Sequence, residues 1–187
     1  MFMMGLLPLW SCSAQQPPVA MENHAKPDRQ APTAEAHFRG LYDRQGDAIV
    51  EADPEDADCA RNYQQLPAKG IWADGMRLTL ATPRQNYQAG ESVHVLHFVE
   101  REGAQAELYI MGPKPVFGES VDGVRRTPDP EMAAYPWVSI YDGEVMPGPG
   151  VDYNFEISKY TFDQAGTHEI VWQLGSLRSN VLTITVE

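Results

Sequence analysis

The end of the chain, residues 165–187, consists of two segments of alternating apolar and polar residues joined by a polar turn. Such alternation is typical of β-strands that bury one face. We expect the buried faces to carry His168, Ile170, Trp172 and Leu174 on the first strand and Leu182, Ile184 and Val186 on the second. A strand pair with one apolar face needs a second layer to cover it, which favours a layered β-structure.

Earlier segments continue this pattern at short intervals. We expect strands over residues 76–82, 92–101, 106–111, 137–141 and 151–158. Residues 92–101 are apolar on both faces, as in a central strand that is covered on both sides. With 15 Pro and 15 Gly the chain is rich in turn residues. The predicted fold class is all-β, an antiparallel β-sandwich of about seven strands, with an N-terminal hairpin and one short helix.

Three short motifs strengthen this prediction. They are YQAGESV at residues 87–93, AGTHEI at residues 165–170, and Ser179-Asn180 before the last strand. On these motifs, residues 76–187 resemble bacterial immunoglobulin-like domains of extracellular and periplasmic proteins. The resemblance implies an immunoglobulin-like sandwich, here without an inter-sheet disulfide because neither cysteine lies in this region. It implies no catalytic residues.

Residues 37–75 are predicted to form an extension to this domain. Residues 37–50 read as a hairpin with its turn at residues 44–47, and residues 51–66 read as a helix. Asp53 is placed to cap the first amides of that helix, and Pro54 suits its first position. We expect Cys59, Tyr63 and Leu66 to share one helix face, which makes Cys59 a small packed residue.

The N-terminus resembles a targeting signal. Residues 1–10 are uncharged and almost entirely apolar, too short to span a bilayer, and similar to the end of a signal peptide. The following Leu9-Trp10-Ser11-Cys12 resembles the bacterial lipobox, with the bulky Trp10 and the absence of a preceding Lys or Arg as departures. The resemblance implies lipidation of Cys12, a signal remnant over residues 1–12, and a periplasmic or cell-surface location with a lipid anchor in the membrane.

Residues 13–36 are rich in Gln, Pro and Ala without apolar periodicity, and we expect a disordered tether there. The other interpretation of the N-terminus is a sticky, disordered segment with an incidental cysteine. In that case Cys12 is free to form a disulfide with Cys59.

The least regular part of the domain, residues 112–136, is the predicted partner-binding segment. It is rich in Pro and combines basic with aromatic residues, the types that dominate binding hot spots. The residues expected to contact a partner are Lys114, Phe117, Arg125, Arg126, Tyr135 and Trp137. The alternative is that the aromatic residues pack this segment onto the sandwich. With a net charge of -12, we expect an envelope protein or surface polymer as the partner and no nucleic acid.

No motif for catalysis or metal binding stands out. His94 and His97 are three apart on one predicted strand and should face opposite sides, so they cannot chelate together. The acidic residues 53–58 suggest calcium, but a helix start explains them equally and the glycine of a calcium loop is absent. GESVDG at residues 118–123 is not a nucleophile elbow and reads as a turn at Asp122-Gly123. We therefore expect no catalytic residues, no metal and no cofactor.

These observations predict a non-catalytic binding or structural module of the bacterial cell envelope, most simply a lipoprotein. The alternative is an inhibitor of a secreted or periplasmic hydrolase. Such an inhibitor would present a Pro-braced loop at residues 112–136, centred on Val116-Phe117, or at residues 146–150.

Overall fold

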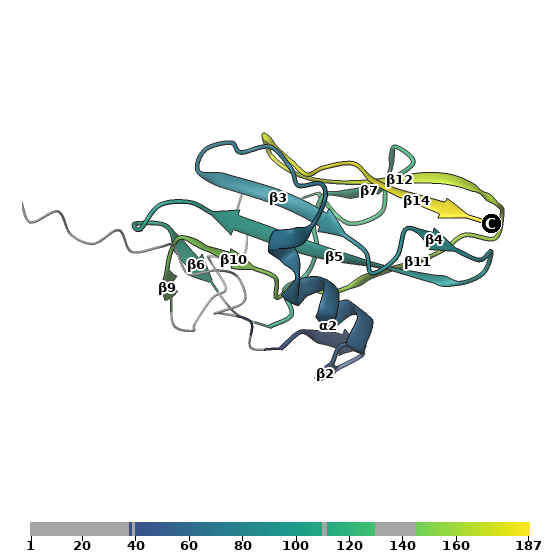
Figure 1. The fold of residues 1–187 in the computed structure, drawn as a ribbon, viewed down its shortest axis with the longest axis horizontal. Helices are drawn as coiled ribbons and strands as arrows, with labels where there is room; N and C mark the ends of the chain where they lie inside the picture. Colours follow the sequence, from purple (N-terminus) through teal and green to yellow (C-terminus); the bar gives the residue numbers. More distant parts are fainter. Residues whose placement is uncertain (1–37, 39, 110–111, 130–144) are drawn as a thin grey trace, which may run out of the picture. The chain divides into compact units, whose positions relative to one another are not determined.

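The computed structural model describes residues 38, 40–109, 112–129 and 145–187. Over these residues the protein is an all-β sandwich with an N-terminal hairpin and one short α-helix, as predicted (Figure 1). The expected signal remnant, the tether and the strand at 137–141 lie outside the described residues.

Two sheets form the sandwich. The first consists of β3 (Met76–Ala81), β5 (Ser92–Arg101), β10 (Gly150–Asp152) and β11 (Ser158–Thr161). The second consists of β4 (Asn86–Tyr87), β14 (Leu182–Val186), β12 (Gly166–Leu174), β7 (Glu119–Val121) and β8 (Val124–Arg125), with β13 (Leu177–Arg178) paired to β12. All these pairings are antiparallel except the parallel contact of β4 with β14.

Smaller elements flank the sandwich. They are the hairpin of β1 (Tyr42–Gln45) and β2 (Ala48–Glu51), the helix α2 (Pro54–Arg61), the 3-10 turn η1 (Tyr63–Gln65), and the pair β6 (Glu107–Tyr109) and β9 (Val145–Pro147). In Figure 1, α2 lies beside β5 on the side away from β12 and β14.

Strand β5 occupies the centre of the structure. It pairs with β3, β10 and β11, and its side chains contribute to two hydrophobic clusters. Val93, Val95 and Val99 belong to the cluster between the sheets, whereas Leu96 and Phe98 belong to the other. The prediction that this strand is covered on both faces is therefore confirmed.

The cluster between the sheets is built around Trp172, which is fully buried. Phe155 and His97 meet its ring edge-on, with ring centroids 5.4 and 5.0 Å away. The apolar faces predicted for the last two long strands point into this cluster, with Ile170, Leu174, Leu182, Ile184 and Val186 all buried. The indole nitrogen of Trp172 donates to the carbonyl of Phe117 at 2.7 Å, so its one polar atom is satisfied.

The second cluster lies under α2 and the N-terminal segment. Its buried members are Leu41, Ala60, Tyr63, Ala81, Leu96, Phe98, Val151, Tyr153 and Ile157. Cys59 and Leu66 pack against it, which confirms the predicted helix face. Burial raises the pKa of the Cys59 thiol to about 12, so this cysteine is an inert packing residue.

A buried polar contact joins the two sheets. His97 Nε2 on β5 lies 2.5 Å from Glu119 Oε2 on β7, and both side chains are fully buried. The hydroxyl of Tyr160, on β11, donates to the other carboxylate oxygen of Glu119. Burial acts to raise the pKa of Glu119, but the charge of His97 and hydrogen bonds from His97, Tyr160 and Ser158 outweigh it and lower that pKa.

Three predicted elements differ from the structure. The strand expected over residues 106–111 is the shorter β6, which pairs with β9 and not with either sheet of the sandwich. The helix expected over residues 51–66 is an eight-residue α-helix followed by η1. The strand expected over residues 151–158 is interrupted, because the chain leaves β5 after Asp152 and returns to it at Ser158. Between them Phe155 turns into the inter-sheet cluster while Tyr153 joins the other, so the regular alternation does not mark one flat strand.

The region around β7 and β8 generates a first prediction. A Cβ atom at Gly118 would overlap the carbonyl oxygen of Gln173 on β12, whereas one at Gly123 in the hairpin turn would meet nothing within 4 Å. Both glycines have positive φ angles, +77° and +75°. We expect Gly123→Ala to lower the free energy of unfolding by about 1 kcal/mol and Gly118→Ala by more than about 3 kcal/mol. Urea denaturation measures both; equal losses would contradict the close packing of β7 on β12.

The Glu119 contact generates a second prediction. A carboxylate whose pKa is lower in the folded state stabilises the fold above its ordinary value of 4.5, and this stabilisation is lost as the pH falls through the folded-state value. We expect Glu119→Gln to lower the free energy of unfolding by about 3 kcal/mol at pH 7. The variant should also lose less stability than the wild type between pH 5 and about 2.

Urea denaturation across this pH range tests the prediction. Glu102→Gln, which removes an exposed carboxylate, controls for the loss of one charge. Parallel pH profiles for Glu119→Gln and the wild type would show that Glu119 is not the titrating group.

Candidate functional site

The predicted partner-binding residues that the structure describes do not form one surface. Tyr135 and Trp137 of that set, and the predicted lipidation residue Cys12, lie outside the described residues. Of the four others, Lys114 is buried in the interior, Phe117 is partly buried against the inter-sheet cluster, and only Arg125 and Arg126 are exposed.

Lys114 was expected to contact a partner, but the structure buries it. Its side chain is fully buried, with Nζ 2.9 Å from Asp152 Oδ1 and 4.4 Å from the centroid of the Phe155 ring. Burial lowers the pKa of Lys114, and the carboxylate of Asp152 opposes that shift. The prediction failed because a lysine in a Pro-rich segment is ordinarily solvated, and nothing in the local sequence reveals the distant carboxylate that allows it to be buried.

Phe117 and its neighbour Val116 belong to the packing of the sandwich. Val116 is buried in the inter-sheet cluster, and Phe117 packs against that cluster. For Phe117 the structure favours the alternative in which aromatic residues pack this segment onto the sandwich. An inhibitor that binds its target through Val116 and Phe117 would need both side chains exposed, and the structure packs them into the sandwich instead.

Arg125 and Arg126 lie on the β7–β8 hairpin. This hairpin was not predicted, although its turn at Asp122-Gly123 was. The strand order of the second sheet ends at β8, whose Val124 side chain is also exposed. Arg125 Nε lies 2.9 Å from Asp129 Oδ1, and both side chains remain open to solvent. The described part of the segment 112–136 therefore presents two arginines and a valine at a sheet edge.

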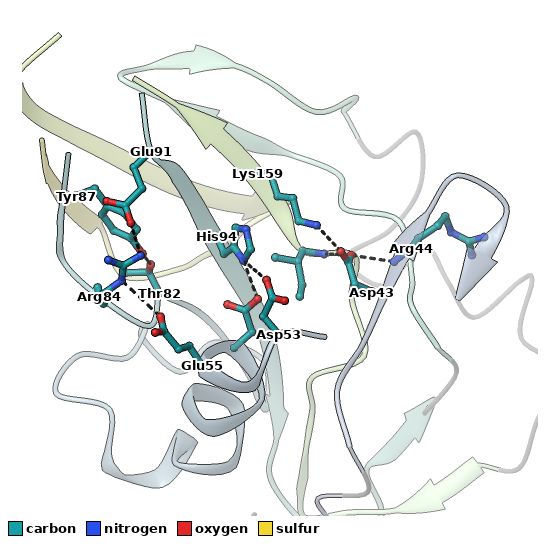
Figure 2. A network of polar contacts seen from close by, with 12 residues as sticks. Asp43, Arg44, Asp53, Glu55, Thr82, Arg84, Tyr87, Glu91, His94 and Lys159 are labelled. Atoms are coloured by element: carbon teal, nitrogen blue, oxygen red, sulfur yellow. Dashed lines mark hydrogen bonds and ion pairs between the residues drawn. The ribbon is translucent and has the colours of Figure 1, made fainter. Parts of the chain in front are cut away.

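A pocket of about 430 Å³ lies elsewhere, where α2 meets β5 and the chain leading into β4. It is lined by Asp53, Pro54, Glu55, Asp56, Pro83, Arg84, Tyr87, Glu91, Ser92 and His94. Figure 2 shows its polar groups in two sets, with Arg84 between Glu55 and Glu91 on one side and the His94 ring facing Asp53, just before α2, on the other.

Alternation along β5 places His94 in this pocket. His94 faces α2, whereas His97 points between the sheets to Glu119, which confirms the prediction that the two histidines face opposite sides. The start of α2 supplies the carboxylates. Pro54 occupies the first turn of the helix as predicted, but the Asp53 side chain makes no capping hydrogen bond. Its carboxylate instead lies 3.8 Å from His94 Nδ1, so the predicted capping role of Asp53 is wrong.

Asp56 makes the closest contact with His94. Its Oδ2 lies 2.7 Å from His94 Nδ1, while its Oδ1 is buried and has no hydrogen-bond partner. The Asp56 side chain is 2% exposed and that of Asp53 is 72% exposed. Burial raises the pKa of Asp56, and the hydrogen bond and charge of His94 oppose the shift. The carboxylate of Asp56 is thus held in a site that lacks full compensation for its lost hydration.

Arg84 forms the other wall of the pocket. Its Nη2 lies 2.5 Å from Glu91 Oε1, its Nε lies 3.5 Å from Glu55 Oε2, and its guanidinium lies 4.8 Å from the centroid of the Tyr87 ring. A hydrogen bond with Glu91 raises the pKa of Arg84. This cation is therefore engaged by carboxylates other than Asp53 and Asp56.

Lys159 is the nearest basic residue on the neighbouring strand, since it pairs with His94 in the register of β11 and β5. Its Nζ lies 2.6 Å from Asp43 Oδ2, and Asp43 also accepts a hydrogen bond from the backbone nitrogen of Arg44 at 2.8 Å (Figure 2). Lys159 thus has a carboxylate partner of its own on β1.

Among the described residues, Asp53, Asp56 and His94 form a group of three side chains close enough to share one metal ion. Each offers one ligand atom, and these atoms lie within 4.8 Å of one another. The helix dipole opposes a cation at this end of α2, by about 0.3–1 kcal/mol for a surface site. Sequence reasoning missed the cluster because it weighed the acidic run and the histidines separately, and 38 positions separate Asp56 from His94. The available signal was a histidine on a central strand together with an Asp-x-x-Asp helix start.

Among the described residues, no helix is long and apolar enough to cross a membrane. No family model, no curated protein and no solved structure matches the chain.

Proposed function

We propose that this chain is a non-catalytic binding module of the bacterial cell envelope, anchored in the membrane through a lipid on Cys12. The apolar leader, the lipobox-like Leu9-Trp10-Ser11-Cys12 and the Pro- and Gln-rich residues 13–36 support the location. A sandwich on such a tether can reach a partner at a distance from the membrane surface.

The exposed sheet edge formed by Val124, Arg125 and Arg126 is the observation that best supports a binding role. An edge strand offers unpaired backbone groups to an incoming segment, and arginine side chains beside it select for acidic groups. In a chain of net charge -12, two adjacent exposed arginines are a local exception. The partner in this proposal is an envelope protein or surface polymer that presents an acidic face.

The anchor is tested by expressing the chain in a bacterium, separating membranes from soluble fractions and measuring the intact mass of the mature protein. We expect cleavage before Cys12, addition of acyl chains and recovery in the membrane fraction. Cys12→Ala should abolish the acylation and the cleavage. An unmodified chain that starts at Met1 and remains in the cytoplasm would refute the envelope proposal.

The binding edge is tested by reversing its charge. We expect Arg125→Glu combined with Arg126→Glu to reduce the material cross-linked to the chain in intact envelopes at least tenfold, because like charges at an interface repel. Quantitative mass spectrometry of the cross-linked products measures the change. The matched control reverses Arg61 and Arg178, two exposed arginines on other elements. An equal loss in both double variants would mean that overall charge, not this edge, controls binding.

A further inference from the structure

We propose that Asp53, Asp56 and His94 form a binding site for one divalent first-row transition-metal ion, with Zn²⁺ as the best fit. This site lies between α2 and β5, and it goes beyond the proposed partner binding at the β8 edge.

The donor spacing is close to that of a coordinated ion. Zinc binds imidazole nitrogen and carboxylate oxygen at about 2.0–2.2 Å, so two ligands of a tetrahedral site lie about 3.4 Å apart. His94 Nδ1 lies 2.7 Å from Asp56 Oδ2 and 3.8 Å from Asp53 Oδ2. Small side-chain rotations bring both distances to about 3.4 Å. The exposed Asp53 side chain has room for the larger rotation.

The buried oxygen of Asp56 points independently to a ligand. Its side chain is 2% exposed and lines the pocket, yet Oδ1 has no hydrogen-bond donor. An unpartnered oxygen adds to the cost of burying the Asp56 carboxylate, and a cation bound through Oδ2 offsets the charge that the carboxylate carries. With a neutral His94 the three side chains carry two negative charges, which a divalent ion neutralises.

The nearest positively charged side chains are engaged elsewhere. Arg84 pairs with Glu91 and Glu55, and Lys159 pairs with Asp43. Of the groups around the cluster, His94 alone makes a short contact with the Asp53 and Asp56 carboxylates within the described structure. The carboxylates of Asp53 and Asp56 are therefore available to an ion from solution.

The donor set selects the kind of ion. Calcium takes six to eight oxygen ligands, and magnesium requires octahedral oxygen geometry. One imidazole nitrogen with two carboxylate oxygens suits Zn²⁺ better. The open pocket leaves the remaining coordination position to water, as in zinc sites with three protein ligands.

The test is a Zn²⁺ titration, in competition with a chromophoric chelator, of the untagged full chain carrying Cys12→Ala to remove a competing thiol. We expect uptake of one Zn²⁺ per chain, unaffected by a tenfold excess of Mg²⁺. His94→Gln should weaken the affinity at least a hundredfold and Asp53→Asn at least tenfold. Asp53 is the more secure variant because its exposed side chain contributes little to folding, which circular dichroism checks.

The matched control is His168→Gln. His168 Nδ1 lies 2.8 Å from Asp122 Oδ2, a similar histidine–carboxylate pair without a third donor, and its loss should leave Zn²⁺ uptake unchanged. The inference is overturned if the Cys12→Ala chain takes up no Zn²⁺ at micromolar concentration, or if either His94→Gln or Asp53→Asn binds it as tightly as that parent chain.

This result is independent of the proposed function. A lipid-anchored chain that takes up no Zn²⁺ would refute the metal site alone. A chain that binds Zn²⁺ but remains unmodified in the cytoplasm would refute the envelope location alone.

Discussion

Strand β5 is buried on both faces, and the arrangement of the other elements follows from this burial. A strand with apolar side chains on both sides must be covered twice, by the second sheet on one face and by α2 with the N-terminal segment on the other. The same alternation sends His97 into the sandwich and His94 toward the helix. The helix and hairpin are thus part of the fold, and the pocket exists because α2 must pack on β5.

The two histidines of β5 illustrate how surroundings decide the role of a polar group. His97 and Glu119 are fully buried, with Tyr160 as a further donor to Glu119, and this contact links the two sheets, although His97 Nδ1 has no hydrogen-bond partner. Lys114 and Asp152 form a comparable interior pair. At His94 the compensation is incomplete, because one oxygen of Asp56 has no partner and the pocket is open to solvent. Both histidine sites leave one buried polar atom without a partner, and the difference is that the Asp56 carboxylate lines an open pocket that an ion from solution can enter.

The sequence predicted the strand and the helix that form the pocket, but not that they lie side by side. It placed His94 on a central strand, predicted that His94 and His97 face opposite sides, and located a helix that starts near Asp53 and Pro54. It assigned Asp53 to capping, but the structure turns that carboxylate toward His94. It also treated Lys114 as exposed, although Asp152 lies beside it in the interior. Each error concerns a charged residue whose partner is far away in the sequence, where local patterns carry no information about distance in space.

Local sequence patterns were sufficient to predict the all-β class, the bounds of β5, the inward faces of β12 and β14, and the face on which α2 packs. These features depend on the two- and 3.6-residue periodicities of strand and helix, which are local properties of the chain. Local patterns did not reveal that residues 151–158 divide between two clusters, that Lys114 is interior, or that the start of α2 brings Asp53 and Asp56 to His94. These features depend on long-range packing and on the pairing of buried charges. Local sequence patterns do not specify which distant residues pack or pair together.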